Sequence, residues 1–431
     1  MRVLVIGGGG REHALCWKLR QSPLLEELYC APGNPGIAEI ADLVPRSVDE
    51  VLEIADFAAS VRIDLAVVGP ELPLALGIAD ELEMRGVPVF GPRQAAAEIE
   101  GSKVFAKEFM ARHGIPTAAF EIAHDEASAR AAARRFGFPV VLKADGLAAG
   151  KGVILPTDEA ELEAALSLFF GERRFGSAAN RIVVEEWLAG EEVSFIALAD
   201  GENVLPLAPS KDYKRLRDGD LGPNTGGMGA HSPAGIMGPE NASWVLERVM
   251  RPVVTALARE NRAFRGFLYA GLMLTPAGLR VLEFNARLGD PEGQVLMLRL
   301  EDDLLELLAA GATGRFPASR LRFRKEAAAC LVLASPGYPE QPLTGEPLGD
   351  LTAARADEGV EIFHAGTARD AEGRLVSAGG RVLDVCATGG SLSEALRRAY
   401  AAAAKVEWPS KVLRRDIGRR ILAATASGDE G

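Results

Sequence analysis

The chain has 431 residues, of which 48% are hydrophobic and 25% are charged, and this ordinary globular usage argues against a disordered chain. One hydrophobic core stops growing near ~250 to 300 residues, so the length excludes a single compact domain and predicts two to four. The formal net charge of −12 argues against nucleic acid as a partner, and a phosphate-bearing ligand must be met by locally placed cations and backbone N–H groups.

The first hundred residues alternate short β-branched runs with helical stretches. The pattern predicts strands at Arg2–Ile6, Leu65–Val68 and Val87–Phe90, and helices at Glu12–Gln21 and Leu74–Arg85. Strands that alternate with helices favour a parallel sheet with crossover helices, which is an α/β architecture.

A glycine-rich turn joins the first predicted strand to the first predicted helix. Residues 7–10 are all glycine, which lets backbone N–H groups approach an anion at the N-terminus of the following helix. A phosphate-bearing ligand is one interpretation and a purely structural tight turn is the other, and the motif alone does not decide between them. His13, in the first turn of that helix, is interpreted as a packing residue rather than a catalytic one.

From Gly101 to about Arg324 the predicted units are longer and mixed, which indicates an α+β region. Helices are predicted at Glu126–Arg135 and Glu159–Leu168. The predicted strands are Pro139–Lys143, Arg181–Glu185, Val193–Ala199, Phe267–Leu274 and Arg280–Phe284.

A loop of small residues separates Lys143 from Lys151. Six of the ten residues after Lys143 are Gly or Ala, and such a loop can close over a triphosphate while the two lysines neutralise it. The order G-x-x-x-x-G-K-[ST] of a P-loop is not present, so a P-loop nucleotidase is disfavoured. A mobile hairpin with solvated lysines is the plainer alternative, but it does not explain the run of small residues.

Two later segments carry further polar groups. Glu185, Glu186 and Leu188 follow a predicted strand and lead to Glu192; a strand edge of this kind can present backbone groups to a purine and a carboxylate to ribose hydroxyls. Alone, it would pass for a charged turn. A cluster of cations that includes Lys214 then precedes the glycine-rich run 222–229, which indicates a long functional loop.

Glu283 and Asn285 lie two residues apart in a predicted strand, so their side chains share one face. Two hard oxygen ligands suit Mg²⁺, which keeps several waters and phosphate oxygens, and Arg287 could stabilise charge on a transferring phosphoryl group. The pair is otherwise commonplace in strands. Its position after the lysine loop and the acidic segment predicts an ATP-binding domain that performs phosphoryl transfer.

The last hundred residues are expected to form a small C-terminal domain, with a strand at Ala327–Ala334, a turn-rich stretch over 335–349 and a helix at Ser391–Val406. The four cysteines show no C-x-x-C spacing and predict buried, reduced thiols, hence a cytoplasmic protein. No run of about 18 apolar residues predicts a membrane span.

These motifs resemble the phosphoribosylamine–glycine ligase family of the ATP-grasp superfamily, nearly from end to end. The resemblance is carried by GGGGREHALCWKL, VGPELPL, GSKVFAKEF, ARHGIPTA, VLKADGLAAGKGV, GPNTGGMGA, GFLYAGLM, EFNARLGDPE, FHAGT and RRDIG. It implies a Rossmann-like domain over residues 1–101, a two-part ATP-grasp domain over 102–324 with a lid at about 122–190, and a small C-terminal domain over 325–431. The implied reaction uses ATP and Mg²⁺ or Mn²⁺ to convert glycine to glycyl phosphate. The amine of 5-phosphoribosylamine then attacks to give glycinamide ribonucleotide, a product of purine biosynthesis.

The resemblance also implies roles for individual residues. Lys103 and Lys143 would contact the ATP phosphates, with Lys151 in the closing loop. The adenine and ribose contacts would come from Glu185, Glu186, Leu188 and Glu192, the metal ligands would be Glu283 and Asn285, and the catalytic cations Arg287 and Lys214. The phosphoribosylamine site would comprise Gly9, Gly10, Arg11, Asn224, Thr225, Gly226, Gly227, Asp290 and Pro291.

Gly8 departs from the family pattern, which has Asn there, so a side-chain contact is in doubt. Ala286 and Leu288 also replace the usual family residues. The strand Phe267–Leu274 offers no carboxylate to the metal pair, although many ATP-grasp enzymes have one there.

Three alternatives remain open. A nicotinamide-dependent oxidoreductase would rest on the first glycines alone, and a non-catalytic nucleotide sensor would bind ATP without turnover. A sibling ligase would use another acid or amine with the same ATP residues. A monomer is expected, because the sequence has no coiled-coil pattern.

Overall fold

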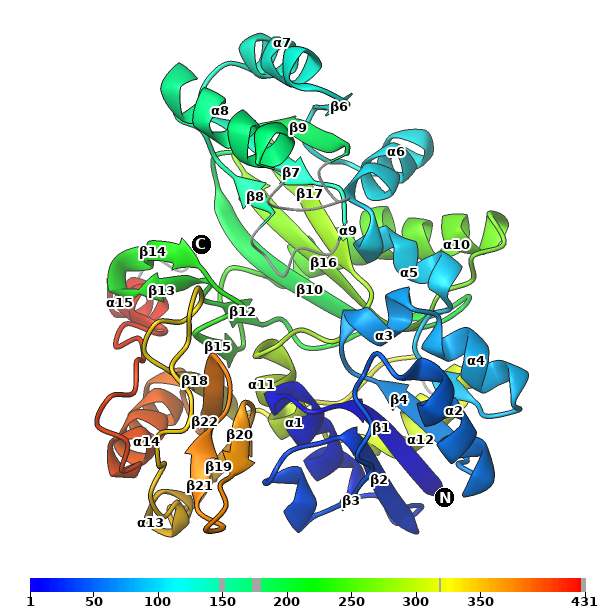
Figure 1. The fold of residues 1–431 in the computed structure, drawn as a ribbon, viewed down its shortest axis with the longest axis vertical. Helices are drawn as coiled ribbons and strands as arrows, with labels where there is room; N and C mark the ends of the chain where they lie inside the picture. The colour runs from blue at the N-terminus through cyan, green and yellow to red at the C-terminus, as the bar shows by residue number, and fades with distance from the viewer. Residues whose placement is uncertain (147–151, 173–179, 318, 428–431) are drawn as a thin grey trace.

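A computed structural model of the chain describes residues 1–146, 152–172, 180–317 and 319–427 (Figure 1). The N-terminal sheet is fully parallel in the order β3-β2-β1-β4-β5, which is the doubly wound order of a Rossmann-like domain. Its apolar strands are buried on both faces, as parallel strands usually are. The strands are β1 (Arg2–Gly7), β2 (Glu27–Pro32), β3 (Asp42–Leu43), β4 (Leu65–Val68) and β5 (Val89–Phe90).

The helices of this domain are α1 (Gly10–Leu19), η1 (Ile37–Glu39), α2 (Val51–Ser60), α3 (Glu71–Ala75) and α4 (Ile78–Met84). The single helix predicted over Leu74–Arg85 is wrong, because two helices meet at Gly77. Gly77 has φ 88° in the left-handed region, which a glycine adopts without a steric cost and which ends a right-handed helix.

Two antiparallel sheets form the middle of the chain, as a two-part ATP-grasp domain requires. The first comprises β6 (Phe120–Ala123), β9 (Ile182–Glu186), β7 (Val140–Ala144) and β8 (Val153–Ile154) in that order. Helices α7 (Glu126–Phe136) and α8 (Glu159–Leu166), followed by η2 (Ser167–Gly171), cover it at the top of Figure 1. The second has the order β11 (Val204–Pro206), β10 (Glu191–Asp200), β16 (Arg265–Thr275) and β17 (Gly278–Asn285).

Helix α6 connects these sheets to the N-terminal domain and carries two lysines on one face. The Ser102 hydroxyl caps it by accepting from the Phe105 N–H at 3.0 Å, and Gly114 ends it with φ 65°. Lys103 and Lys107 are four residues apart and so point in the same direction. The helices around this region are α5 (Gln94–Gly101), α6 (Lys103–His113), α9 (Pro239–Val245), η5 (Leu246–Met250) and α10 (Arg251–Arg259).

A third sheet combines middle and C-terminal strands in the order β12-β15-β18-β22-β19. Strands β12 (Lys211–Asp212) and β15 (Gly229–Ser232) come from the ATP-grasp region, and β18 (Ala327–Ala334), β19 (Val360–His364) and β22 (Arg381–Gly389) from the C-terminal one. This shared sheet ties the two regions together. The remaining elements are β13 (Arg215–Arg217), η4 (Asp218–Asp220), β14 (Leu221–Asn224), α11 (Glu292–Arg299), α12 (Leu304–Ala312), α13 (Thr352–Arg355), β20 (Thr367–Arg369), β21 (Leu375–Ser377), α14 (Leu392–Lys405) and α15 (Arg419–Ser427).

One hydrophobic core spans the first sheet and the β10–β16–β17 sheet. Leu4 and Ile6 belong to the same buried cluster as Leu268 and Phe284. All four cysteines are buried and free, as the sequence predicted. Among the described residues, no helix has the length and apolar character needed to cross a bilayer.

Candidate active site

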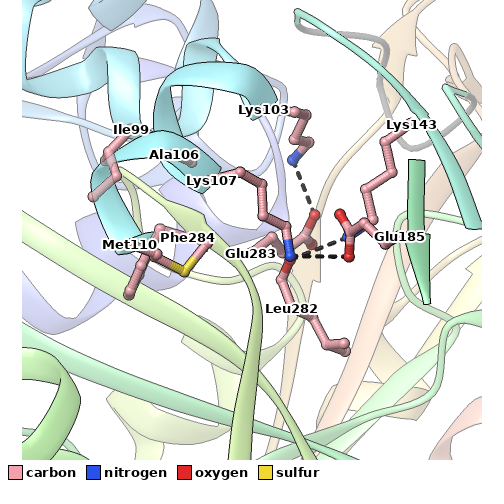
Figure 2. A pocket seen from close by; sticks show the side chains of 10 residues that line it. All are labelled: Ile99, Lys103, Ala106, Lys107, Met110, Lys143, Glu185, Leu282, Glu283 and Phe284. Atoms are coloured by element: carbon pink, nitrogen blue, oxygen red, sulfur yellow. Dashed lines mark hydrogen bonds and ion pairs between the residues drawn. The ribbon is translucent and has the colours of Figure 1, made fainter. Parts of the chain in front are cut away.

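A cavity lies between helix α6 and strands β7, β9 and β17, and five of the ten side chains that line it are charged (Figure 2). Apolar side chains, including Met110 and Phe284, complete one wall. The charged residues are Lys103 and Lys107 from α6, Lys143 from β7, Glu185 from β9 and Glu283 from β17. The structure therefore brings together Lys103, Lys143 and Glu283, which the sequence analysis assigned to ATP phosphates and metal.

Ion pairs connect the lysines to the two glutamates. Lys103 Nζ lies 2.9 Å from Glu283 Oε2, while Glu185 receives Lys143 on one oxygen and Lys107 on the other, both at 2.9 Å. Lys143 also donates to the Leu282 carbonyl at 3.1 Å, so it bridges the two sheets. These lysines concentrate positive charge beside Glu283 and Asn285, the predicted metal ligands, in a chain whose net charge is negative.

The environment shifts several pKa values in this cavity. The Lys103 ammonium is the main reason that the pKa of Glu283 lies far below its ordinary value. Burial alone would raise the pKa of Glu185, but Lys143 and Lys107 outweigh it and lower that pKa. Burial lowers the pKa of Lys107 to about 8. Both carboxylates are thus held ionised, as charge-paired acids should be.

Glu185 pairs with Lys107 and Lys143 through its side chain, in addition to the backbone contact with adenine that the sequence predicts. Its backbone lies in the middle of a sheet, opposite Phe120 on β6 and Val141 on β7. Glu186 ends the strand and accepts from the Ala119 N–H at 2.8 Å, and Leu188 lies two residues beyond it. The adenine assignments stay predictions. Lys151 falls outside the described residues.

Glu192, the predicted ribose ligand, lies on the same face of the β10–β16–β17 sheet as Glu283 and Asn285, the predicted metal ligands. Glu192 and Ser194 are two residues apart on β10, Ser194 stands opposite Gly271, and Gly271 stands opposite Glu283. Directly opposed residues point to the same side of an antiparallel sheet. Glu192 also pairs with Lys214 Nζ at 3.1 Å, which brings that predicted catalytic lysine to the same face.

The donor set of Glu283 and Asn285 fits a magnesium ion that keeps phosphate oxygens and waters as its other ligands. Within the described residues, no cluster of three or more His, Cys, Asp or Glu side chains is arranged for a metal ion. A metal at this site would therefore depend on the bound nucleotide.

Arg287 points toward two carboxylates of the N-terminal region. Its Nε lies 3.3 Å from Glu71 Oε2 and 3.4 Å from Glu100 Oε1. Burial would lower the pKa of Arg287, but Glu100 and Glu71 raise it above the ordinary value. The catalytic assignment of Arg287 stays a prediction, and the structure adds a contact that joins it to helices α3 and α5.

The predicted phosphoribosylamine residues meet at a junction of all three regions. Arg11 donates to the Leu288 carbonyl at 2.9 Å, next to the segment that contains Asp290. A Cβ on Gly10 would lie 1.7 Å from Asp384 Oδ2, so only glycine allows α1 to approach β22 this closely. Gly9 lies beside Asp290, because its Cβ would be 3.6 Å from Asp290 Oδ2.

The second glycine-rich loop closes on this junction. A Cβ on Gly227, which has φ 118°, would lie 2.5 Å from Cδ of Pro291. Thr225 holds the loop by donating its N–H and hydroxyl to the Lys214 carbonyl at 2.7 and 2.8 Å. Asn224 is exposed at the end of β14 and pairs with Arg215. Gly227 thus reaches the Asp290 segment, whereas Asn224 is exposed.

Models of three consecutive domains match the chain: the phosphoribosylglycinamide synthetase N domain over residues 1–100, its ATP-grasp (A) domain over 101–293 and its C domain over 328–420. The phosphoribosylamine–glycine ligases of Mesorhizobium japonicum and Brucella melitensis are 50% and 48% identical over 423 residues, covering 98% of this chain and 99% and 98% of theirs. The crystal structure of phosphoribosylamine–glycine ligase from Thermotoga maritima has a TM-score of 0.85 at 36% identity, covering 96% of this chain and all of that one.

The chain belongs to the phosphoribosylglycinamide synthetase family. The three domain models follow one another in the order that the motifs predicted, and the family assignment made from the sequence is confirmed.

In this member of the synthetase family, Arg381 and Asp384 of the C domain and Gln294 of α11 contact the predicted phosphoribosylamine junction, and the sequence analysis named none of the three. Arg381 donates to the Gly226 carbonyl at 2.8 Å and to Asp290 Oδ2 at 3.0 Å. Gln294 bridges Asp290 Oδ1 at 2.8 Å and Asp384 Oδ2 at 2.7 Å. Burial raises the pKa of Asp384 to about 7. An Asp within the apolar run of β22 was the available signal, because a buried strand rarely carries an unpaired carboxylate.

Lys107 was also missed, although its spacing from Lys103 on α6 could have indicated it. The doubtful position Gly8 has a structural explanation. A Cβ there would lie 2.6 Å from the Gly33 carbonyl oxygen, so an Asn would require the backbone to shift. Asn34 instead brings an amide to this turn and donates to the carbonyls of Gly8 and His364 at 2.9 and 2.7 Å.

Proposed function

We propose that this chain is an ATP-dependent ligase that forms glycinamide ribonucleotide from glycine and 5-phosphoribosylamine, with Mg²⁺ or Mn²⁺ as cofactor. The observation that carries the proposal is the cavity in which Lys103, Lys107 and Lys143 surround Glu185 and Glu283, the predicted metal ligand. Phosphoryl transfer relies on such positioned cations, because charge must be stabilised on the transferring group. The family relationship supplies the identity of the acid and the amine.

The reaction has two steps. A glycine carboxylate oxygen bonds to the γ-phosphorus of ATP, and the bond to the β,γ-bridging oxygen breaks to release ADP. The amine nitrogen of phosphoribosylamine then bonds to the acyl carbon of glycyl phosphate, the acyl–oxygen bond to phosphate breaks, and the nitrogen loses a proton. Activation makes an unreactive carboxylate into an acylating agent. A divalent cation would supply further charge stabilisation at Glu283 and Asn285.

The chain's own residues divide this work. Lys103 and Lys143 would hold the triphosphate, and Glu192 would accept from ribose hydroxyls of ATP. The phosphoribosylamine would lie at the junction of Gly9, Gly10 and Arg11 with Asp290. Two aspartates, the buried Asp384 and the partly buried Asp290, adjoin the N-terminus of α1 there, and carboxylates accept hydrogen bonds from sugar hydroxyls.

The test measures ADP release and product mass with purified protein, ATP, Mg²⁺, glycine and phosphoribosylamine. We expect ADP release that requires both glycine and phosphoribosylamine, with glycinamide ribonucleotide as product. Alanine, serine and bicarbonate each replace glycine in parallel reactions. Equal turnover with any of them would overturn the proposed acid, and ATP binding without glycine-dependent ADP release would indicate a nucleotide sensor.

We also propose that the enzyme acts as a monomer in the cytoplasm. The four buried, free cysteines fit a reducing compartment, in which thiols are kept reduced. Size-exclusion chromatography with light scattering would check the oligomeric state, with an expected mass of one chain.

A further inference from the structure

Several hydroxyl groups lie on the same face of the β10–β16–β17 sheet as Glu283 and Asn285. Tyr269 stands opposite Asn285, and Ser194 stands opposite Gly271, so both hydroxyls lie on the face that carries Glu283 and Asn285. Ser194 Oγ is 2.7 Å from the Tyr269 hydroxyl. Both side chains are almost fully buried.

Ser210 adds a buried hydroxyl without a partner. It forms an antiparallel bridge with Ser194 and therefore points to the same face. Its side chain is 1% exposed, and its Oγ has no hydrogen-bond partner among the residues that the structure describes. A buried hydroxyl without a hydrogen-bond partner is unfavourable, so this hydroxyl is suited to a ligand.

Two carboxylates complete this polar cluster. Asp212 lies two residues beyond Ser210 in an extended segment and so shares its side. Glu292, the first residue of α11, is 3% exposed and accepts from Ser194 Oγ at 3.2 Å. Asp212 is half-buried.

The charges of the cluster favour a small cation between the two carboxylates. Burial raises the pKa of Asp212 to about 7; Lys214 opposes this shift, and Glu292 and Glu192 add to it. Carboxylates that repel one another in a buried site are stabilised by an ammonium group placed between them.

We propose that Ser210, Asp212 and Glu292 bind the ammonium group of glycine. An ammonium has three N–H donors, and two carboxylates and one hydroxyl supply three acceptors. Ser194 and Tyr269 are positioning residues that hold Glu292. The glycine carboxylate would then extend toward Glu283 and Asn285, where the γ-phosphate is expected to bind. This assignment rests on the proposed function, which it deepens by separating the glycine site from the phosphoribosylamine junction.

The variants Glu292→Gln and Asp212→Asn test the proposal, because each removes a charge but keeps the shape. We expect the KM for glycine to rise about 10- to 100-fold in each, as for the loss of a hydrogen bond to a charged group. The KM values for ATP and phosphoribosylamine should stay within about twofold of wild type. Glu240→Gln is the matched control, because Glu240 is also in the first turn of a helix but is exposed.

A binding measurement provides a readout apart from turnover. Glycine should raise the unfolding temperature of the wild type in the presence of Mg²⁺ and a non-hydrolysable ATP analogue, and this shift should vanish in both variants. If Glu292→Gln does not fold, Asp212→Asn and Ser210→Ala decide the question.

Two results separate the claims. A wild type that releases no ADP with glycine and phosphoribosylamine overturns the proposed function and this assignment with it. A normal wild type with unchanged glycine KM in the variants, or with all three KM values raised equally, overturns the glycine site alone.

Discussion

Lys107 is the buried lysine whose removal gives the sharpest test of the electrostatics in the cavity. Its Nζ lies 2.9 Å from Glu185 Oε2 and donates to Thr117 Oγ1 at 2.7 Å. Burial lowers its pKa from 10.5 to about 8. We consider the substitution Lys107→Met, which removes the ammonium group but keeps an unbranched side chain only one atom shorter, while Glu185 retains Lys143 as a partner.

The pH dependence follows from the direction of that shift. Between pH 8 and 10.5 the unfolded chain keeps the proton of Lys107 while the folded chain releases it. The unfolded state then binds more protons, so the free energy of unfolding rises with pH across this window. A gap of about 2.5 pH units corresponds to about 3 kcal/mol. The wild type should gain about this amount between pH 7 and 10.5, and Lys107→Met should not.

Urea unfolding followed by circular dichroism at intervals from pH 7 to 10.5 measures this difference. The free energy of unfolding of Lys107→Met minus that of the wild type should be largest at pH 7. This difference should fall by about 3 kcal/mol by pH 10.5. Lys325→Met serves as the control, because Lys325 is exposed, and its difference from wild type should stay flat. A constant difference between wild type and Lys107→Met across the window would refute the reasoning.

Three further changes have expected outcomes. Burial raises the folded pKa of Asp384 to about 7, so its ionisation should lower the thermal stability of the wild type as pH rises from about 4 to 7. Asp384→Asn should remove this contribution, and melting curves of both proteins at pH 5 and 8 check this. Arg414→Met removes a buried guanidinium that pairs with two aspartates and should destabilise the chain by about 3 to 5 kcal/mol by calorimetry, whereas the same change at exposed Arg420 should cost under about 1 kcal/mol. Glu283→Ala should abolish Mg²⁺-dependent ADP release while circular dichroism stays unchanged, and wild-type activity in that variant would contradict the metal assignment.

The sequence predicted those parts of the fold that local patterns determine. Buried runs such as Leu65–Val68 and Ala327–Ala334 appear as strands with those bounds, because a short apolar run is typical of a strand in the interior of a sheet, where both faces are covered. Helix α14 was predicted to within a residue at each end, since Ser391 caps it by accepting from the Glu394 N–H.

The parts that the sequence did not predict depend on distant contacts. Strand β12 is only two residues long and is a strand because it pairs with β15, which in turn pairs with β18. Arg381 and Asp384 reach the junction by tertiary folding, some 90 residues from Asp290 and Gln294. A pattern within one window of sequence cannot reveal such pairs, whereas Glu283 and Asn285 are two residues apart and could be found.

The residues of the cavity come from two sheets and from helix α6, so the lysines and the predicted metal ligands Glu283 and Asn285 belong to different elements but would act on the same ligand. Glu283 and Asn285 belong to the β10–β16–β17 sheet, while Lys143 comes from the other sheet and Lys103 from α6. A triphosphate offers oxygens that compete with Glu283 for the Lys103 ammonium. We expect its binding to move that ammonium onto phosphate and to leave the Glu283 oxygens for a divalent cation. The same lysine would thus hold Glu283 ionised before nucleotide binds and then release it as a metal ligand, which couples metal affinity to nucleotide occupancy.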